Sequence, residues 1–182
     1  MLVVSDHMGS HANRSRGRGR SAAADDLRVV LDALRHIVRV LRLSSRGAEK
    51  RVGLSGAQLF VLHRLAEGRA VSLGELADRT FTHQSSVSVV VSRLVARGLV
   101  ARWPSAADGR RVELALTAPG RALLRRAPAA AQERLIAGLQ RLPVAERRAL
   151  AVTLVRLVRE IGVDRTVPGM FFEERGASDE RA

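Results

Sequence analysis

Apolar side chains recur at intervals of three and four residues along much of the chain, which is the pattern of amphipathic helices. The first such stretch follows Asp25 and Asp26, whose negative charges suit the positive end of a helix dipole. Gly47 and the polar residues after it interrupt the pattern, so the sequence predicts a helix within residues 25–50. Its apolar stripe consists of Leu27, Val30, Leu31, Leu34, Ile37, Val38 and Leu41.

Two serines mark the starts of the next helices, because each is followed three residues later by a side chain that can complete a capping box. Ser55 and Gln58 open one helix, which Gly68 ends, and Ser72 and Glu75 open another. The buried face of the first of these helices is predicted to contain Leu59, Leu62 and Leu65, broadened by Phe60 and Val61.

A tight turn at 80–82 precedes an amphipathic helix over 83–97, which Gly98 closes. Its apolar side contains Val87, Val90, Val91, Leu94 and Val95. Its other side is rich in serine, a weak helix former whose small hydroxyl permits close approach to phosphates and base edges of DNA. We therefore expect DNA contacts from Gln84, Ser85, Ser86, Ser88, Val89, Ser92 and Arg93. The alternative is that these are simply solvated polar positions.

A β-hairpin is predicted after this helix. The alternation of apolar and other residues over Val112–Leu116 indicates a half-buried strand, which pairs with Leu99–Trp103. Asp108 and Gly109 supply turn chemistry at the tip. Beside this turn, Arg110 and Arg111 are expected to meet the sugar-phosphate edge or a narrow minor groove.

Two helices joined by a tight turn and followed by a hairpin form the plan of a winged helix-turn-helix, which places one helix in the major groove of DNA. The predicted fold is mainly α with a small β wing (α+β), in which this winged helix-turn-helix is flanked by N- and C-terminal dimerisation helices. We expect Trp103 to pack at the base of the wing, the alternative being the wall of a ligand pocket.

Helical patterns return after Gly120, with Pro128 predicted to break them and Pro143 to stand near the start of the last helix. This last helix carries an apolar stripe of Leu150, Leu154, Leu157, Val158 and Ile161. The winged part has too little surface left to cover this stripe as well as that of the first helix. A homodimer would bury both.

The predicted organisation is a disordered basic arm (1–24), an N-terminal dimerisation helix (25–50), a winged helix-turn-helix domain (51–120), C-terminal dimerisation helices (121–162) and a tail (163–182). The arm is low in apolar residues, so it cannot bury enough surface to offset the entropy that it would lose on becoming ordered. It is either a solvated leader or an arm that touches DNA. We expect the tail to fray, the alternative being that Phe171 and Phe172 dock on the dimer helices.

The chain has a formal net charge of +13, almost all of it from arginine, since Lys50 is the only lysine. Such a charge suits double-stranded DNA first and an anionic membrane surface second. A membrane role is disfavoured because only 3% of the residues are aromatic and no apolar run is long enough to cross a bilayer. The absence of cysteine excludes disulfides and thiolate metal sites and agrees with a cytoplasmic protein.

An enzyme is the first competing class. The histidines are scattered, none has metal-ligand spacing, and no nucleophile triad, phosphate loop or dinucleotide motif appears. We therefore expect no catalytic residues, no metal and no cofactor. His36 and His63 are the two candidates for lining an effector pocket, although structural histidines are commoner on amphipathic helices. A nonspecific architectural nucleic-acid binder remains the alternative to a sequence-specific regulator.

The segments QSSVSVVVSRLVARGLV and DGRRVELALTAPG resemble the recognition helix and wing signature of the MarR family of bacterial transcriptional regulators. The matching signature residues are Asp108, Arg110, Leu114, Leu116, Thr117 and Gly120. The resemblance extends from about Asp25 to Gly162. The basic arm is not part of the family's usual core.

The resemblance implies a homodimer with interlocked terminal helices that reads a pseudo-palindromic operator, most simply as a repressor. It implies that Arg110 enters the minor groove and that Asp108 orients it. It also implies release by a small aromatic or phenolic effector bound between the dimer helices and the winged domain. The family's oxidation switch needs a cysteine, which this chain lacks.

Overall fold

Residues 11–68, 71–105, 111–163 and 167–173 are described in the computed structural model of the chain, with side chains described from residue 24 onward. The chain divides into the units Met1–Val40 and Leu41–Ala182. Helix α1 (His11–Val52) runs from the first unit into the second, and all other helices and strands belong to the second.

Helix α1 is longer than the helix predicted over 25–50, and it includes residues 11–24 of the arm that we expected to be disordered. Gly47 does not end it, because Ala48, Glu49 and Lys50 are good helix formers and offset the cost of one glycine. The helix ends at Gly53, which has a left-handed φ of 66° and donates its amide to the Glu49 carbonyl at 2.9 Å.

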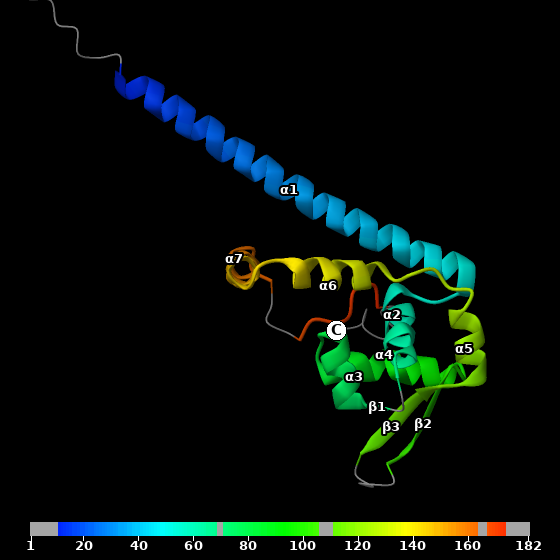
Figure 1. Ribbon diagram of the computed structural model, residues 1–182. Helices are drawn as coiled ribbons and strands as arrows, with labels where there is room; N and C mark the ends of the chain where they lie inside the picture. The colour runs from blue at the N-terminus through cyan, green and yellow to red at the C-terminus, as the bar shows by residue number, and fades with distance from the viewer. Residues whose placement is uncertain (1–10, 69–70, 106–110, 164–166, 174–182) are drawn as a thin grey trace, which may run out of the picture. The chain divides into compact units, whose positions relative to one another are not determined.

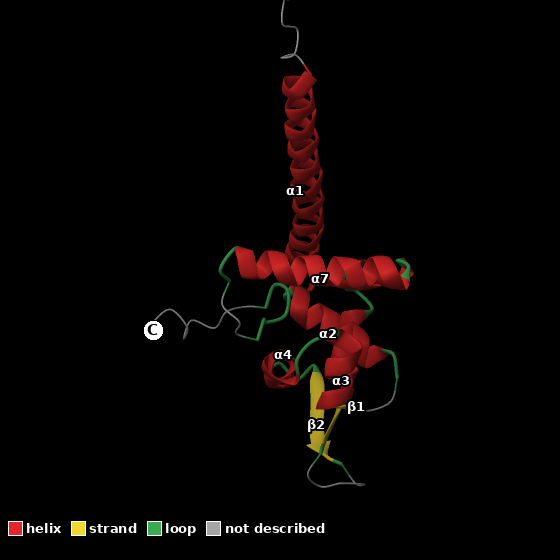
Figure 2. Cartoon of the chain, turned by 90° about the vertical axis from the view of Figure 1, so that its left-hand side faces the viewer, coloured by secondary structure: helices red, strands yellow, loops and turns green. Residues whose placement is uncertain are grey.

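The winged helix-turn-helix is present in the second unit (Figures 1 and 2). It consists of α2 (Gly56–Ala66), β1 (Val71–Ser72), α3 (Leu73–Thr80), α4 (Gln84–Ala96), β2 (Val100–Pro104) and β3 (Val112–Leu116). The three strands form an antiparallel sheet in the order β1-β3-β2. The hairpin of β2 and β3 confirms the predicted wing, whereas β1 was not predicted, since two residues are too short to show periodicity.

Helix α2 lies at the centre of the core. Its buried residues include Leu59, Leu62 and Leu65, as predicted, and burial continues around the helix through Gly56, Ala57, Gln58, Phe60 and Val61. The wider core adds Leu76, Val87, Val90, Val91, Leu94, Val100, Leu114 and Leu116 from α3, α4 and the sheet. The apolar side predicted for the 83–97 helix is thus confirmed as the side that packs on α2 and α3.

Both predicted capping boxes are present. The Ser55 hydroxyl accepts the Gln58 amide at 3.3 Å, and the Gln58 side chain accepts the Ser55 amide at 3.1 Å. In the second box, the Ser72 hydroxyl accepts the Glu75 amide at 3.2 Å while the Glu75 carboxylate accepts the Ser72 amide at 2.7 Å. The starts of α2 and α3 are therefore fixed by local sequence.

Three helices follow the wing: α5 (Ala118–Leu124), α6 (Ala131–Arg141) and α7 (Val144–Glu160). The break between α5 and α6 contains Pro128, as predicted, and Pro143 is the N-cap of α7. Helix α7 buries none of its residues within this chain. No helix among the described residues is long and apolar enough to cross a membrane.

The described part of the tail, 167–173, does not fray. Met170 is only 8% exposed and belongs to the core that surrounds α2. The expectation of a frayed end was therefore wrong for this segment, because Met170, which the sequence pattern did not single out, supplies a buried anchor.

Candidate nucleic-acid interface

The turn between α3 and α4 depends on Phe81, which has a left-handed φ of 53° although it is not a glycine. Its amide donates to the Asp78 carbonyl at 3.1 Å, and the Thr82 amide donates to the Ala77 carbonyl at the same distance. The buried Thr80 hydroxyl donates to the Leu76 carbonyl at 2.8 Å. These bonds satisfy the end of α3 and direct the chain into α4.

Helix α4 presents a polar stripe away from the core. Gln84, Ser85 and Ser92 are exposed, Ser88 is half-buried, and Val89 is 45% exposed. The Ser92 hydroxyl donates to the Ser88 carbonyl at 2.9 Å and so leaves its acceptor lone pairs toward solvent. These five predicted contact residues thus share one accessible side of α4.

Two predicted contact residues lie elsewhere on α4. Ser86 is 7% exposed, and its hydroxyl donates to the Pro168 carbonyl at 3.0 Å. Arg93 lies two helical turns further along the same flank and pairs with Glu173, with 4.0 Å between Arg93 Nη1 and Glu173 Oε1. Ser86 therefore faces the C-terminal segment and is not accessible in the stripe, whereas the side chain of Arg93 is 29% exposed. Contacts of these two residues with DNA stay predictions.

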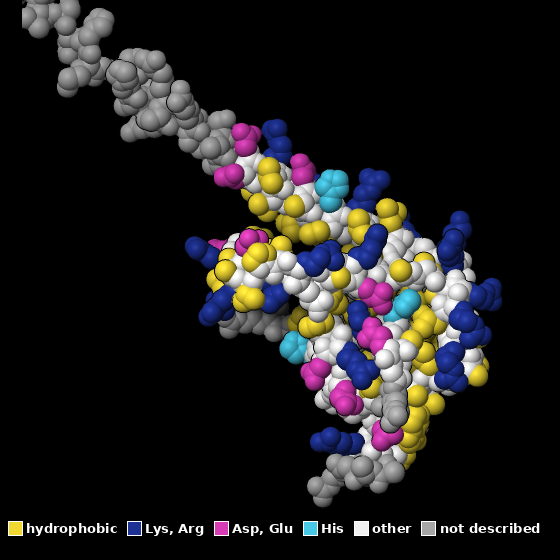
Figure 3. Space-filling model, in the orientation of Figure 1, with side chains coloured by type: hydrophobic (Ala, Val, Ile, Leu, Met, Phe, Trp, Pro, Cys, Tyr) yellow, Lys and Arg dark blue, Asp and Glu magenta, His cyan; other side chains and the backbone are white. Residues whose placement is uncertain are grey.

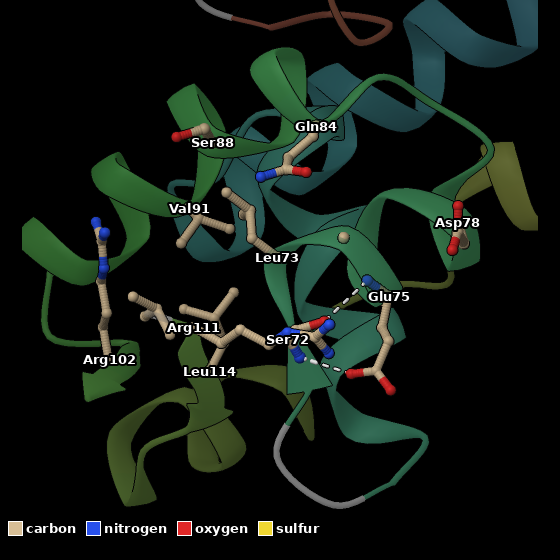
Figure 4. A pocket seen from close by; sticks show the side chains of 12 residues that line it. Ser72, Leu73, Glu75, Asp78, Gln84, Ser88, Val91, Arg102, Arg111 and Leu114 are labelled. Carbon is tan, nitrogen blue, oxygen red and sulfur yellow. Dashed lines mark hydrogen bonds between the residues drawn. The ribbon is translucent and has the colours of Figure 1, made fainter. Parts of the chain in front are cut away.

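A cleft of about 520 Å³ lies between the start of α3, the flank of α4 and the wing. Figure 4 shows Gln84 and Ser88 extending from α4 on one side of it, with Ser72 and Glu75 on another. The remaining lining residues named in the figure are Leu73, Asp78, Val91, Arg102, Arg111 and Leu114. Arg102 was not predicted, although its position opposite Leu114 in the β2–β3 register brings it to this cleft.

Electrostatics at the cleft are mixed. The hydrogen bonds from the Ser72 amide and hydroxyl lower the pKa of Glu75, and the charges of Arg79 and Arg111 lower it further. Glu75 is thus held as an anion that caps α3. The arginine side chains at the cleft are then the groups that attract a polyanion.

The wing is braced by Glu113. Its carboxylate accepts the Trp103 indole N–H at 3.2 Å and the Ser105 hydroxyl at 2.7 Å, both from the opposite side of the hairpin. Trp103 is 37% exposed and pairs with Glu113 in register. It is the last residue but one of β2, so it lies toward the tip of the wing and not at the base, where we expected it. Arg111 is exposed beside the tip, whereas Asp108 and Arg110 fall outside the described residues.

Thr117 joins the wing to α5. Its hydroxyl donates to the Gly98 carbonyl at 2.7 Å and accepts the Gly120 amide at 3.1 Å. Its own amide donates to the Leu99 carbonyl at 3.1 Å. The Leu-Thr-x-x-Gly part of the wing signature is therefore a structural joint between β3, α5 and the end of α4.

The two histidines proposed for an effector pocket have other surroundings. His63 Nε2 lies 3.3 Å from the Pro128 carbonyl, and Nδ1 lies 3.7 Å from Glu133 Oε1. Both ring nitrogens thus face groups of the protein, so His63 braces α2 against the start of α6. His36 is exposed on α1. A role of either residue in an effector pocket stays a prediction, and no group of acidic or histidine side chains among the described residues could hold a metal.

Comparisons with known proteins agree with this geometry. Residues 52–111 match the family model described as the MarR family. The HTH-type transcriptional repressor Rv2887 of Mycobacterium tuberculosis is 30% identical over 125 residues, which cover 69% of this chain and 87% of the relative. The HTH-type transcriptional repressor MdtR of Bacillus subtilis is 32% identical over 95 residues, but the match spans only 52% of this chain and 59% of MdtR.

Solved structures show the same fold. A probable transcriptional regulator from Pseudomonas aeruginosa is 31% identical, with a TM-score of 0.50, and the match covers 74% of this chain and 98% of that one. Sco3205 of Streptomyces coelicolor, a MarR family regulator solved in complex with DNA, is 24% identical, with a TM-score of 0.55 and coverage of 80% and 94%. These proteins are transcriptional regulators and not enzymes, which is the class that the sequence predicted.

Proposed function

Because the chain belongs to the MarR family of DNA-binding transcriptional regulators, we propose that it acts in the cytoplasm as a homodimeric repressor of a pseudo-palindromic operator. Helix α4 enters the major groove in each half-site, and the wing meets the adjacent backbone or minor groove. The repressor assignment rests on the names of the relatives, which are called transcriptional repressors.

The observation that carries this proposal is the accessible polar stripe of α4 beside an arginine-bearing cleft. Gln84 and Ser88 line the cleft together with Arg102 and Arg111. A backbone phosphate held near the two arginines would place Gln84, Ser85 and Ser88 against base edges. Gln84 can pair with adenine through both of its amide atoms, which makes it the strongest candidate for reading sequence. At the wing tip, Asp108 and Arg110 remain proposed contacts on the strength of the family resemblance.

The apolar surface of α7 supports the dimer. Leu150, Leu154, Leu157, Val158 and Ile161 are between 37% and 63% exposed, and Figure 3 shows hydrophobic side chains among the arginines where α7 reaches the surface. On α1, the stripe of Leu27, Val30, Leu31, Ile37 and Val38 is between 41% and 62% exposed. Such stripes are costly in water, and a second copy would cover them. A two-fold dimer would place its two α4 helices about 34 Å apart, one turn of B-DNA.

An effector site is supported by an apolar hollow of about 370 Å³. It lies between α2, the α3–α4 turn, α6 and residues 168–171, and its walls include Phe60, Phe81, Leu135 and Ile136. Its size and lining suit a small aromatic or phenolic molecule. A ligand that binds better to one arrangement of α4 than to another would change operator affinity by that difference.

Selection of bound sites from random duplexes tests the main proposal. A sequence-specific repressor should yield a palindromic consensus and bind it about a thousandfold or more tighter than unrelated DNA at physiological salt. Recovery of no consensus, with equal affinity for every duplex and a steep salt dependence, would instead indicate the nonspecific architectural class.

A further inference from the structure

The C-terminal segment Val167–Glu173, termed the strap below, lies against the flank of α4. The buried Ser86 hydroxyl donates to the Pro168 carbonyl at 3.0 Å, and Glu173 pairs with Arg93. Ser86 and Arg93 stand two helical turns apart on one flank of α4. The strap therefore contacts α4 along its length on the flank beside the stripe proposed to read DNA.

The strap is also held by helices outside the helix-turn-helix. Gln132 on α6 is 6% exposed, and its amide group donates to the Phe171 carbonyl at 3.2 Å. Phe172 Cβ lies 3.6 Å from the point where a Cβ on Gly56, at the start of α2, would stand. Met170 enters the core around α2 and is 8% exposed. One short segment thus connects α4 with α2 and α6.

Hydrogen bonds within the strap give it a defined shape. The Met170 amide donates to Glu173 Oε2 at 3.2 Å, and the Glu173 amide donates to the Met170 carbonyl at 3.1 Å. Phe172 takes a left-handed φ of 56° within this turn. A folded turn with a buried anchor transmits position better than an extended chain would, because fewer of its torsions are free to absorb a displacement.

We propose that the strap is a positioning element for α4, and that Ser86, Gln132 and Met170 are its positioning residues. By tying α4 to α6, which leads into the proposed dimer helix α7, the strap sets where α4 stands relative to the two-fold axis. It thereby sets the half-site spacing that the dimer prefers. This inference rests on the proposed function of α4 as the recognition helix.

The test measures the affinity of the full chain for duplexes in which the two half-sites are separated by spacers that differ by one base pair. The wild type should bind best at one spacing. The variants Ser86→Ala, Gln132→Ala and Met170→Ala should reduce the preference for that spacing over its neighbours by about tenfold, within the range typical of coupling between sites. Val167→Ala, at a strap residue that is 54% exposed, is the control and should keep the wild-type profile.

The spacing profile separates positioning from stability. A variant that is only destabilised has a smaller folded fraction and loses affinity by the same factor at every spacing. If all three variants behave in this way, or if their profiles match the wild type, the strap does not position α4. If Met170→Ala fails to fold, Ser86→Ala and Gln132→Ala, which retain the apolar anchor, decide the question. A wild-type chain without any preferred spacing would contradict the proposed function itself, and the strap proposal with it.

Discussion

Gly120 lies directly against the carbonyl oxygen of Leu99. A Cβ built on Gly120 would stand 2.2 Å from that oxygen and 3.1 Å from the carbonyl carbon, distances that a backbone contact cannot accommodate. Because the same carbonyl accepts the Thr117 amide, the start of α5 is held close to the entry of β2. The last glycine of the wing signature is thus required by packing.

Gly120→Ala should therefore destabilise the fold by about 1–3 kcal/mol, the usual cost of overpacking a tight site. Thermal or urea unfolding measures the change. Gly138→Ala is the matched control, since a Cβ there meets nothing closer than the Arg141 side chain at 4.0 Å and alanine is the better helix former. Equal stability of Gly120→Ala and the wild type would contradict the close approach of Gly120 to the Leu99 carbonyl.

Glu75 gives the winged domain a pH-dependent contribution to stability. Its pKa is lower in the folded chain than in the unfolded chain, so its contribution is present at neutral pH and is lost as the pH falls through the folded value. The stability advantage of the wild type over Glu75→Gln should shrink as the solution is acidified below the ordinary glutamate range. Unfolding at a series of pH values measures it. Glu146→Gln, in the first turn of a helix without a capping box, is the control.

Gln84→Ala should weaken operator binding by about 1–3 kcal/mol and relax the preference at one base pair in each half-site. The physical reason is loss of a side-chain amide that both donates to and accepts from a base edge. Fluorescence anisotropy on the operator and on single-base variants measures both effects. Gln140→Ala, an exposed glutamine on α6, should leave the affinity unchanged. Loss of affinity without a relaxed base preference would indicate that Gln84 contacts the DNA backbone and not a base.

Arg111→Ala should lower the affinity for all duplexes by a similar factor, because an arginine bound to a phosphate carries no base information. The slope of log affinity against log salt concentration should fall by about one for each phosphate that the variant no longer neutralises. A titration at several salt concentrations measures it, with Arg134→Ala on an exposed position of α6 as the control. An unchanged slope would remove Arg111 from the interface.

Leu154→Arg should raise the dimer dissociation constant by about two orders of magnitude, since it would bury an unpaired charge in each copy. Sedimentation velocity over a concentration series measures the dimer. Val152→Arg is the matched control, because Val152 is 64% exposed and lies on the opposite side of α7 from the apolar stripe. A monomeric wild type, or equal effects of the two variants, would contradict α7 as the dimer helix.

The elements that sequence predicted well are those governed by local rules. Ser55 and Ser72 start their helices through bonds to residues three positions on, and such bonds need no tertiary context. The strand Val112–Leu116 shows its alternation because one of its faces is buried. Helix ends were harder to predict. Either Gly47 or Gly53 could end α1 as far as the sequence shows, and only the left-handed backbone of Gly53 in the structure identifies it as the end.

At the site, the surroundings that sequence could not predict come from contacts between residues far apart in the chain. Ser86 is a small polar residue of the kind expected to face DNA. The strap, which follows it by more than eighty residues in the chain, covers it. His63 likewise meets Pro128 and Glu133, which only the packing of α2 against α6 brings near. Phe81 in a left-handed turn could not be foreseen, because aromatic residues rarely take that conformation. Periodicity identifies a helix face, but it does not identify what covers that face.

The hydrogen bond between Trp103 and Glu113 has a practical consequence. Trp103 is the only tryptophan of the chain, which has no tyrosine. Fluorescence excited at wavelengths that phenylalanine does not absorb therefore comes from the wing alone. The indole is partly exposed on β2. Repressor and operator can therefore be mixed without any attached dye, and the colour and intensity of the emitted light would report the moment at which the wing meets the duplex.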